Sequence, residues 1–379
     1  MEDNQEPIRI AQIIGKWVGG GVEAVIMNYY RAMNRGKIQF DFICDEDSTN
    51  IPYEEIKSLG GKVILIPPYQ KLFKYQRVLK EILREGNYKI VHSHINALSV
   101  FPLRIAKKVG VPIRIAHSHS TTNKKEWKKN FFKSILKPFS KVYATNYFCC
   151  TEHAGRWLFG NKKFENGEIY ILNNAINLEK FIYNEKIREN KRTELKIDKD
   201  TIVLGHIGRF VEQKNHKFLI NIFNEVHKKN INTKLILVGQ GPLKKEIEQQ
   251  IKQLNIEDYV LMLGQRADVN EIYQAFDIFL FPSLYEGLGM VAIEAQAAGN
   301  LCIVSTEIPK VAKVTKKMKF LDLSAPNQRW VDCILSAIEN IGEKSDVSID
   351  EFVNAGYDIK QESIKLEKQY LKLYDNSNR

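Results

Sequence analysis

Two glutamates flank a glycine-bearing turn in residues 284–299, which read LYEGLGMVAIEAQAAG. Glu286 and Glu294 lie eight positions apart, a little over two turns if the whole stretch were helical. The glycines at 287 and 289 predict instead a loop that leads into a helix ending at Gly299. Amide groups at the start of such a helix attract anions. The stretch therefore predicts a site for a ligand that carries both hydroxyl and phosphate groups.

Each group in this stretch has an expected partner on that ligand. The first amides would donate to phosphate or sugar oxygens, Glu294 would accept bonds from both ribose hydroxyls, and Glu286 would point beyond a diphosphate. In the structural alternative, Glu286 caps the helix and Glu294 pairs with a lysine on its surface. The amides in question belong to Leu288, Gly289, Met290 and Val291.

Two cations form a second candidate group in the stretch GRFVEQKNH, residues 208–216. Arg209 ends a predicted strand, and Lys214 follows five residues later, at the entry to a helix that begins near His216. Both side chains can converge on one crevice, where a diphosphate needs cations to offset its charge. The alternative is a pair of solvated surface charges.

Three successive glycines, residues 19–21, follow the first predicted strand and lead directly into a helix. Glycine at that junction lets backbone amides approach an anion. The run does not match GxGxxG, and no acidic residue follows where a dinucleotide ribose would need one. The glycine run can be interpreted either as a phosphate-binding loop or as a tight turn between strand and helix.

These residues lie in a chain that alternates strands and helices in two series. Most predicted strands are continuously apolar, which is typical of strands buried on both faces of a parallel sheet. A charged stretch without apolar periodicity, 189–200, lies between the series, as expected near a domain junction. The order predicts two doubly wound α/β domains with ligands at the strand ends. The predicted strands are 8–15, 40–44, 62–67, 88–94, 113–119 and 147–152, then 201–209, 233–241, 259–265, 278–283, 301–306 and 319–323.

Length and composition agree with two soluble domains. The chain has 379 residues, of which 44% are hydrophobic and 27% charged. It has no apolar run long enough to span a bilayer, and its five cysteines lack metal-ligand spacing. Its acidic, polar first residues, MEDNQEP, are not expected to act as a signal peptide. Such cysteines predict a reducing, cytoplasmic location. The net charge of +11 predicts an anionic partner: nucleic acid, an acidic membrane or a phosphorylated substrate.

Together these stretches resemble the retaining glycosyltransferases of family 4, which have the GT-B architecture. The matching pieces, in the family's order, are GGGVE, GRFVEQKN, LILVGQGP, LGQR and FPSLYEGLGMVAIEAQAAG. The resemblance implies an α/β protein of two Rossmann-like doubly wound domains that face a central cleft, with a C-terminal helix crossing back to the N-terminal domain. It implies an acceptor-side domain at 1–178 with a helix at about 355–379, and a nucleotide-sugar-binding domain at 179–354.

The resemblance assigns roles around the donor. Arg209 and Lys214 would neutralise the diphosphate as it leaves. Glu294 would bind the ribose and Glu286 would face the transferred sugar, while the backbone of 288–291 would surround the diphosphate and the sugar hydroxyls.

Four other positions are compared with the family in the same way. Gly21 matches the glycine near the diphosphate, and Arg266 falls where the family contacts the nucleobase. Ala175 stands where a glycine is usual, and Asn300 where a proline is usual. Neither departure is expected to touch the donor.

Histidines are the resemblance's candidates for the other side of the reaction. His119 matches the family histidine close to the donor sugar and the acceptor, and His117 is the alternative for that role. His92 and His94 would support the crevice wall or the acceptor side. Glu23 would also face the acceptor.

The implied reaction is departure of a nucleoside diphosphate with attack by an acceptor hydroxyl on the same face. Cations and helix amides would stabilise the charge on the leaving group. No cofactor and no metal is expected, because two cations already offset that charge, and the acidic run at 45–47 is expected to be solvated. The sugar would be a hexose or N-acetylhexosamine, carried by UDP, with GDP and ADP as alternatives.

A basic segment, 121–141, bears on the acceptor. It has seven lysines against one glutamate, and apolar side chains recur every four residues. The pattern predicts an amphipathic helix on an anionic membrane, or a helix packed on the first domain with a solvated lysine face. The expected acceptor is therefore a saccharide, linked to a lipid diphosphate as in capsule or exopolysaccharide assembly. The expected location is the cytoplasm, at the inner face of the cell membrane.

Two other functions stay open. A nucleotide-sugar epimerase on the same fold would need no acceptor, and mass spectrometry of the products separates isomerisation from transfer. A non-enzymatic basic module that binds membrane or nucleic acid would bind with a steep salt dependence. Nucleic acid is not the expected partner, because the sequence has no nucleic-acid-binding motif.

Overall fold

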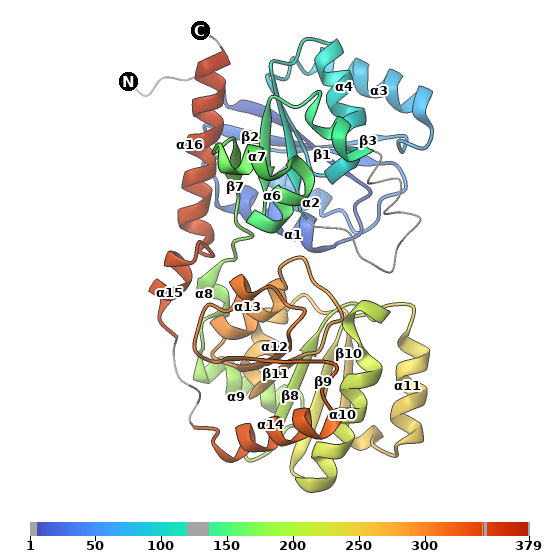
Figure 1. Cartoon of the computed structure of the whole chain (residues 1–379), viewed down its shortest axis with the longest axis vertical. Coiled ribbons are helices and arrows are strands. Elements are labelled where there is room, and N and C mark those ends of the chain that lie inside the picture. The colour runs from blue at the N-terminus through green and yellow to red at the C-terminus, as the bar shows by residue number, and fades with distance from the viewer. Residues whose placement is uncertain (1–5, 120–135, 343, 345–346, 378–379) are drawn as a thin grey trace. The chain divides into compact units, whose positions relative to one another are not determined.

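The computed structural model describes residues 6–119, 136–342, 344 and 347–377. The chain divides into two compact units, Met1–Ile176 with Gly356–Arg379, and Asn177–Ala355. In each unit a parallel sheet has helices on both faces, which Figure 1 shows in blue and green for the first unit and in yellow and orange for the second. The prediction of two doubly wound α/β domains is confirmed.

The described part of the first unit holds a seven-stranded sheet in the order β3-β2-β1-β4-β5-β6-β7, parallel throughout. Its strands are β1 (Ile8–Gly15), β2 (Ile38–Asp45), β3 (Lys62–Ile66), β4 (Ile90–Ser93), β5 (Ile113–Ser118), β6 (Asn146–Cys149) and β7 (Ile169–Ile171). Its helices are α1 (Gly21–Ala32), α2 (Tyr53–Ser58), α3 (Leu72–Glu85), α4 (Val100–Lys108), α6 (Glu152–Phe159), α7 (Asn161–Glu165) and α16 (Ile359–Ser377), with short 3-10 turns η1 (Asn96–Ser99) and η2 (Lys137–Lys141).

Two apolar layers hold this first sheet. On one face α1 and the C-terminal helix α16 cover β1 and β2, and Phe40, Phe42 and Tyr370 are buried there together. On the other face α3, α4 and α6 pack through residues such as Leu79 and Leu103. Burying strands on both faces is what their continuous apolar runs require. The predicted return of the last helix to the first domain is confirmed.

The described part of the second unit holds a six-stranded parallel sheet in the order β10-β9-β8-β11-β12-β13. Its strands are β8 (Ile202–Ile207), β9 (Thr233–Val238), β10 (Val260–Gly264), β11 (Ile278–Phe281), β12 (Leu301–Ser305) and β13 (Met318–Leu321). Its helices are α8 (Leu178–Phe181), α9 (Glu185–Glu194), α10 (His216–Lys229), α11 (Lys244–Gln253), α12 (Val269–Ala275), α13 (Met290–Ala297), α14 (Asn327–Glu339) and α15 (Ile349–Asn354), with 3-10 turns η3 (Glu212–Lys214), η4 (Glu257–Tyr259) and η5 (Lys310–Ala312).

Strand order identifies one point in each sheet where the chain reverses its direction of winding. In the first sheet this point lies between β1 and β4, and in the second between β8 and β11. Loops that leave neighbouring strands at such a point diverge, and ligands bind there in open α/β sheets. The glycine run follows β1, Arg209 and Lys214 follow β8, and Glu286 follows β11. The fold therefore brings the predicted groups to these two points.

Three segments differ from the expectation or lie outside the described residues. The short strand β7 was not predicted. The charged stretch 189–200 belongs to the second unit, where Lys191 on α9 is buried and pairs with Asp268 and Glu271. Most of the basic segment 121–141 lies outside the described residues, and its described end forms η2. No described helix is both long enough and apolar enough to cross a bilayer.

Candidate functional site

The second unit's site begins with the loop that connects β11 to α13. Gly289 caps α13 in the left-handed region, at φ +83°, and a Cβ there would lie 3.1 Å from Phe281. Ala292 N donates to Gly289 O, so the amides of Met290 and Val291 lie in the turn that has no intrahelical acceptors. No described side chain caps this end, and Glu286 in particular does not. The helix therefore offers free donors where the sequence predicted them.

A second loop is fastened to the first. Leu284 N donates to Gln213 O at 2.8 Å, and Gln213 Nε2 donates to Tyr285 O at 2.9 Å. Asn215 Nδ2 donates to Pro282 O at 3.2 Å. These bonds join the residues around η3 to the loop after β11. Side chains from the two predicted groups are held at a fixed separation as a result.

Lys214 and Glu286 form an ion pair across these loops. Lys214 Nζ lies 2.6 Å from Glu286 Oε1 and 4.7 Å from the ring centroid of Phe281. The two side chains are only 15% and 9% exposed. A charge-assisted bond in such a place is stronger than a surface pair. Both predicted residues are thus in one group, paired with each other.

Glu294 has a tyrosine as its partner rather than a lysine. Tyr273 on α12 is buried, and its hydroxyl donates to Glu294 Oε2 at 2.9 Å. Burial raises the pKa of Glu294 to about 7, against the opposing effects of the Tyr273 hydrogen bond and the Lys214 charge. The free chain therefore holds a carboxyl group that titrates near neutral pH beside the Lys214 cation.

Asn300 contributes to this arrangement indirectly. Its Nδ2 donates to the backbone oxygen of Tyr273 at 3.1 Å. Asn300 is buried, three residues after the end of α13. The residue that departs from the commoner family pattern therefore supports the helix whose tyrosine holds Glu294.

The two arginines of the prediction have different surroundings. Arg209 is exposed two residues after the end of β8, and it has no acidic partner within the described part of the chain. Arg266 bonds to Asp268 at 2.6 and 2.7 Å and to Glu194 at 3.0 Å. Arg209 is therefore available to an anion, whereas Arg266 is engaged in an ion-pair network with α9.

The glycine run of the first unit leads into α1 as predicted. Gly19 is left-handed at φ +75°, and Gly21 opens α1, where an added Cβ would meet no atom within 4 Å. Glu23 is 6% exposed, and its Oε1 accepts from Val18 N at 2.9 Å. One loop donor is thus satisfied by the carboxylate predicted to face the acceptor. Glu23 supports the loop in this structure.

The four histidines predicted from the first unit lie together: His92 and His117 are in β4 and β5, and His94 and His119 are the residues that follow these strands. His92 Nε2 and His117 Nδ1 are 3.0 Å apart, and His94 Nδ1 and His119 Nε2 are 2.8 Å apart. Burial lowers the pKa of His119 to about 3 and the pKa of the other three well below the usual value. All four are therefore neutral near pH 7. The four side chains form one hydrogen-bonded cluster. Their arrangement therefore does not select His117 or His119 alone as the histidine near the donor sugar.

A cavity of about 410 Å³ lies at the carboxyl ends of the first unit's strands. Asp45 lines it and is 6% exposed, and burial raises the pKa of this carboxyl to about 6. The expectation that the acidic run 45–47 is solvated was wrong for Asp45, because β2 carries it into the sheet edge. Asp47 is half exposed and pairs with Lys16 at 2.6 Å. Apolar residues such as Tyr69 form much of the remaining wall.

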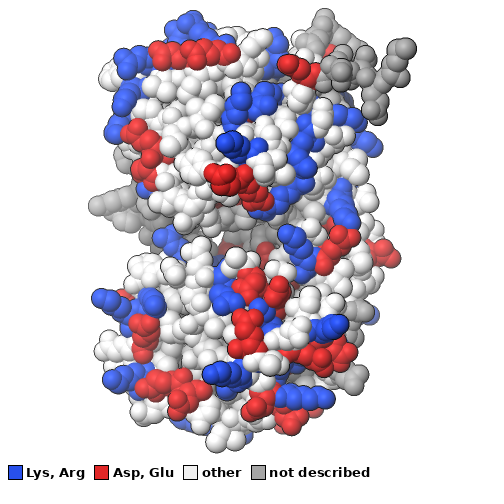
Figure 2. Space-filling model, turned by 180° about the vertical axis from the view of Figure 1, so that it is seen from behind, with Lys and Arg blue, Asp and Glu red and all other residues white. Residues whose placement is uncertain are grey.

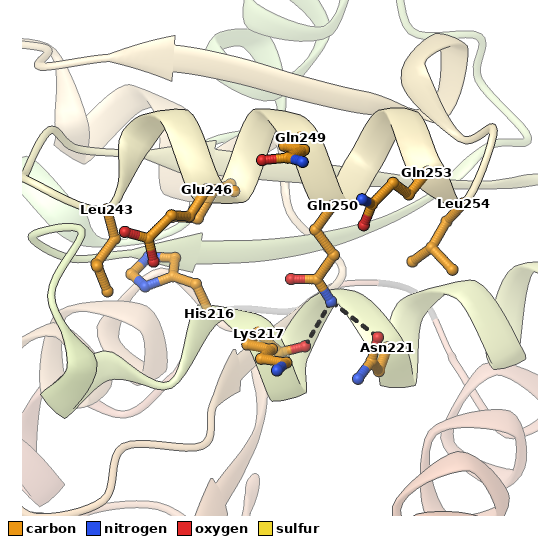
Figure 3. A pocket seen from close by; sticks show the side chains of 10 residues that line it. His216, Lys217, Asn221, Leu243, Glu246, Gln249, Gln250, Gln253 and Leu254 are labelled. Carbon is orange, nitrogen blue, oxygen red and sulfur yellow. Dashed lines mark hydrogen bonds between the residues drawn. The ribbon is translucent and has the colours of Figure 1, made fainter.

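A second cavity, of about 430 Å³, lies between α10 and α11 (Figure 3). Gln250 spans it, because its Nε2 donates to Lys217 O at 3.0 Å and to Asn221 Oδ1 at 2.8 Å. His216 is buried at its edge. No sequence motif indicates this cavity, since its lining comes from helix faces.

Charges of both signs are mixed on the face that Figure 2 shows. Figure 2 shows Lys and Arg interleaved with Asp and Glu over the face in view, rather than gathered in one continuous basic patch. A phosphate-tracking surface for nucleic acid would concentrate its cations.

The structure also adds residues that the motifs did not indicate. Tyr273, Gln213 and Asn215 hold the groups of the second unit, and Gln12 and Tyr370 bond to the histidines of the first. None carries a local signature, because each acts through a partner distant in sequence.

Comparison with known proteins follows the same division of the chain. A family described as glycosyltransferase family 4 matches residues 19–180, and one described as glycosyl transferases group 1 matches residues 187–346. EpsF of Bacillus subtilis (strain 168), whose name places it among the glycosyltransferases, is 34% identical over 364 residues, or 94% of this chain and 95% of EpsF.

Two more distant proteins are similar over most of their length. An Escherichia coli protein named UDP-Gal:alpha-D-GlcNAc-diphosphoundecaprenol alpha-1,3-galactosyltransferase is 23% identical, over 80% of this chain and 81% of its own. The crystal structure of Anabaena HepE in complex with UDP-glucose matches with a TM-score of 0.79 and 15% identity, over 96% of this chain and 99% of HepE. At that identity the likeness to HepE concerns the fold.

Proposed function

The chain belongs to glycosyltransferase family 4, and on that premise we propose that it is a retaining enzyme which moves a hexose or N-acetylhexosamine from a UDP-sugar to a lipid-linked saccharide. The observation that carries the proposal is the group at the β8–β11 point of the second unit. There Lys214 bonds to Glu286, and its charge also acts on Glu294. A cation that bonds to one carboxyl group and acts electrostatically on a second, together with a helix start, suits a ligand with hydroxyls at both ends and a diphosphate between them.

Each group has a role in this proposal. Glu294 accepts bonds from the ribose hydroxyls, and Glu286 accepts from a hydroxyl of the sugar. Arg209, Lys214 and the amides of Met290 and Val291 stabilise the charge that develops on the diphosphate.

We propose that these groups act without a metal or cofactor. Lys214 is already half of an ion pair, so the uncompensated positive charge comes from Arg209 and the helix amides. Arg209 is exposed, and its long side chain can reach an anion and bind it with two parallel bonds. Loss of its guanidinium should slow the chemical step by about 10²–10³-fold, as loss of an oxyanion donor does.

The acceptor would bind to the first unit. Its cavity combines Asp45, which can accept from a saccharide hydroxyl, with apolar walls against which a sugar face can pack. Lipid linkage is supported by the Escherichia coli relative, whose name gives a diphosphoundecaprenol-linked sugar as its acceptor. Apolar side chains also reach solvent on this unit, with Phe73 90% exposed and Phe139, in the described end of the basic segment, 51% exposed. An enzyme at the cytoplasmic face of a membrane would use such residues.

The test combines binding and product analysis. A thermal-shift series with UDP, GDP, ADP and their sugars, with and without EDTA, should show a shift for UDP compounds that EDTA leaves intact. Mass spectrometry and NMR of the product with a lipid-linked acceptor should then show an added sugar in retained configuration. Absence of a shift with every nucleotide would refute the donor site, and isomerised free nucleotide sugar would establish an epimerase instead.

A further inference from the structure

The four histidines are joined to two other buried residues in a continuous set of hydrogen bonds. Gln12 on β1 lies between Tyr370 of α16 and His94, the residue after β4, and all three are buried. Its Nε2 donates to the Tyr370 hydroxyl at 3.4 Å, and its Oε1 lies 2.7 Å from His94 Nε2. An amide has donors only on its nitrogen and an acceptor only at its oxygen. Gln12 therefore imposes a direction on both neighbours.

One branch runs from Tyr370 to His117. The Tyr370 hydroxyl has one proton, and its partner at 2.6 Å is His92 Nδ1. Burial raises the pKa of Tyr370 well above the usual value, so the hydroxyl keeps that proton and donates it. His92 then carries its own proton on Nε2, which it donates to His117 Nδ1 at 3.0 Å. His117 must in turn carry its proton on Nε2.

The other branch runs toward Gln12 from His119. Because Gln12 offers an oxygen, His94 Nε2 must carry the proton, and His94 Nδ1 is left as an acceptor. His119 Nε2, 2.8 Å away, donates its proton to His94 Nδ1. The remaining nitrogen of His119, Nδ1, is then a bare lone pair.

Both branches end at atoms that lack a partner. His117 Nε2 and His119 Nδ1 are buried, and neither has a hydrogen-bond partner among the described residues. Their rings are stacked, with centroids 3.8 Å apart. By the directions above, one end is a donor and the other an acceptor. A buried polar atom without a partner is costly, so such a pair calls for a ligand that supplies both.

We propose that Gln12 and Tyr370 are positioning residues which hold all four histidines as the Nε2–H tautomer, so that His119 accepts a hydrogen bond from a substrate hydroxyl while His117 donates one. The inference rests on the proposed transferase function, which supplies hydroxyl-bearing substrates. It also explains why a tyrosine of the last helix reaches the sheet of the first unit. Rotation of the Gln12 amide by half a turn would reverse every bond and make His119 a donor.

The close contacts between imidazoles are better explained as hydrogen bonds than as a metal site. His92, His94 and His117 each offer a nitrogen within 4.8 Å of the others, which would permit a metal ion. Ligands around tetrahedral zinc, at about 2.0–2.1 Å from the metal, lie about 3.3 Å apart. Within this group the contact between His92 Nε2 and His117 Nδ1, at 3.0 Å, is shorter than that and matches a hydrogen bond.

The first experiment uses the wild-type chain labelled with ¹⁵N-histidine. Two-bond ¹H–¹⁵N spectra distinguish which ring nitrogen carries the proton, and single substitutions of each histidine assign the signals. We expect protonated Nε2 and bare Nδ1 in all four. Protonated Nδ1 in His94 or His119 would overturn the proposal, as would one equivalent of tightly bound transition metal that is lost with His92. This readout does not depend on activity, so it separates the inference from the proposed function.

The second experiment measures turnover in two variants with a matched control. Gln12→Met removes the amide, and Tyr370→Phe removes only the hydroxyl. Tyr88→Phe is the control, since Tyr88 is a buried tyrosine of the same unit whose hydroxyl bonds to Asp41 at 2.8 Å. We expect kcat to fall about tenfold in Gln12→Met, the worth of one hydrogen bond, with KM for the nucleotide sugar changed less than twofold.

The ¹⁵N signals of the histidines show whether a change in turnover is accompanied by a change of tautomer. In Gln12→Met the His94 and His119 signals should become mixtures of tautomers, and in Tyr370→Phe the His92 and His117 signals should do so first. A Gln12→Met protein that keeps both wild-type turnover and pure Nε2–H signals would refute the assignment. A variant that no longer shows a thermal shift with nucleotides is misfolded or has lost donor binding. In that case the tautomers seen in the wild-type spectrum decide whether the proposal holds.

Discussion

Lys214 Nζ and Glu286 Oε1 lie 2.6 Å apart, in a pair that neutralises the cation expected to meet a diphosphate. Both side chains are mostly buried, so neither charge is well screened by solvent. The pair holds Lys214 in place before a ligand arrives. It also means that a diphosphate must share Lys214 with Glu286, which a sugar hydroxyl bonded to Glu286 would make easier.

Breaking this pair should destabilise the protein more than it would at the surface. In Lys214→Met, Glu286 is left buried without its partner, and we expect a loss of about 3 kcal/mol in the free energy of unfolding, near the lower end for buried pairs. Lys228→Met is the control, because Lys228 and Glu225 are 61% and 49% exposed, and it should cost less than about 1 kcal/mol. Chemical denaturation measures both.

A second substitution separates stability from function. Adding Glu286→Gln to Lys214→Met removes the unpaired charge and should recover most of the lost stability. Turnover should stay low, because neither the cation nor the carboxylate is restored. Equal losses in the single variant and in the Lys228 control would contradict the importance of burial.

Glu294 should make donor binding depend on pH. With its pKa raised from near 4.5 to about 7 in the free chain, this carboxyl is largely protonated at pH 6. Accepting two ribose hydroxyls requires the carboxylate, so binding should release a proton below pH 7. We expect donor affinity to rise up to about tenfold between pH 6 and pH 8. Calorimetry in buffers of different ionisation enthalpy measures both the affinity and the proton.

Two variants check the source of this dependence. Glu294→Gln should bind the donor weakly and with a flat pH profile. Tyr273→Phe removes a hydrogen bond that lowers the pKa of Glu294, so the rise in affinity should move to higher pH. A wild-type profile as flat as that of Glu294→Gln would mean that this carboxyl does not contact the donor.

The cap of α13 can be tested through its backbone. Gly289→Ala introduces a Cβ at φ +83°, where it meets Phe281 at 3.1 Å and Ile308 at 3.3 Å. Gly110 is left-handed at φ +84° with no atom within 4 Å of an added Cβ, so Gly110→Ala isolates the backbone strain. We expect about 1 kcal/mol lost in Gly110→Ala and more in Gly289→Ala. Only Gly289→Ala should weaken UDP binding. Equal effects of the two variants on binding would contradict a role for the amides at the start of α13.

The sheets could be predicted from the sequence because most of their strands are continuous apolar runs. A run such as that of β1 is apolar throughout, and burial on both faces allows little else. The three-residue β7 lacks that signal, and its Ile171 is 40% exposed. The helix α9 was missed because its polar residues, among them Lys191, bury their charges in pairs.

Partners within the site were harder to predict than the site residues. The spacing of Glu286 and Glu294 indicates a ligand, but their contacts to Lys214 and Tyr273 span 72 and 21 positions. Such contacts depend on where the fold brings two chain segments together. The same holds for Gln12, whose bond to Tyr370 spans 358 positions.

The buried histidines should make the protein sensitive to acid. The pKa values of the four histidines are lowered in the folded state, mainly by burial. Below pH 6.5 these histidines therefore bind protons in the unfolded chain but not in the folded chain. Stability is then lost as the pH falls, by about 1.4 kcal/mol per pH unit for each such group, and for His119 the loss continues to about pH 3.

Replacing one of these groups should remove its share of the pH dependence. In His119→Gln we expect a lower stability at pH 7, because the bond to His94 is weakened, but a shallower decline between pH 6 and pH 4. The difference in slope should approach about 1.4 kcal/mol per pH unit. His153→Gln, which replaces an exposed histidine on α6, is the control and should follow the wild type. Denaturant midpoints at half-unit pH steps measure the slopes; parallel curves for His119→Gln and wild type would show that His119 takes up its proton in the folded protein.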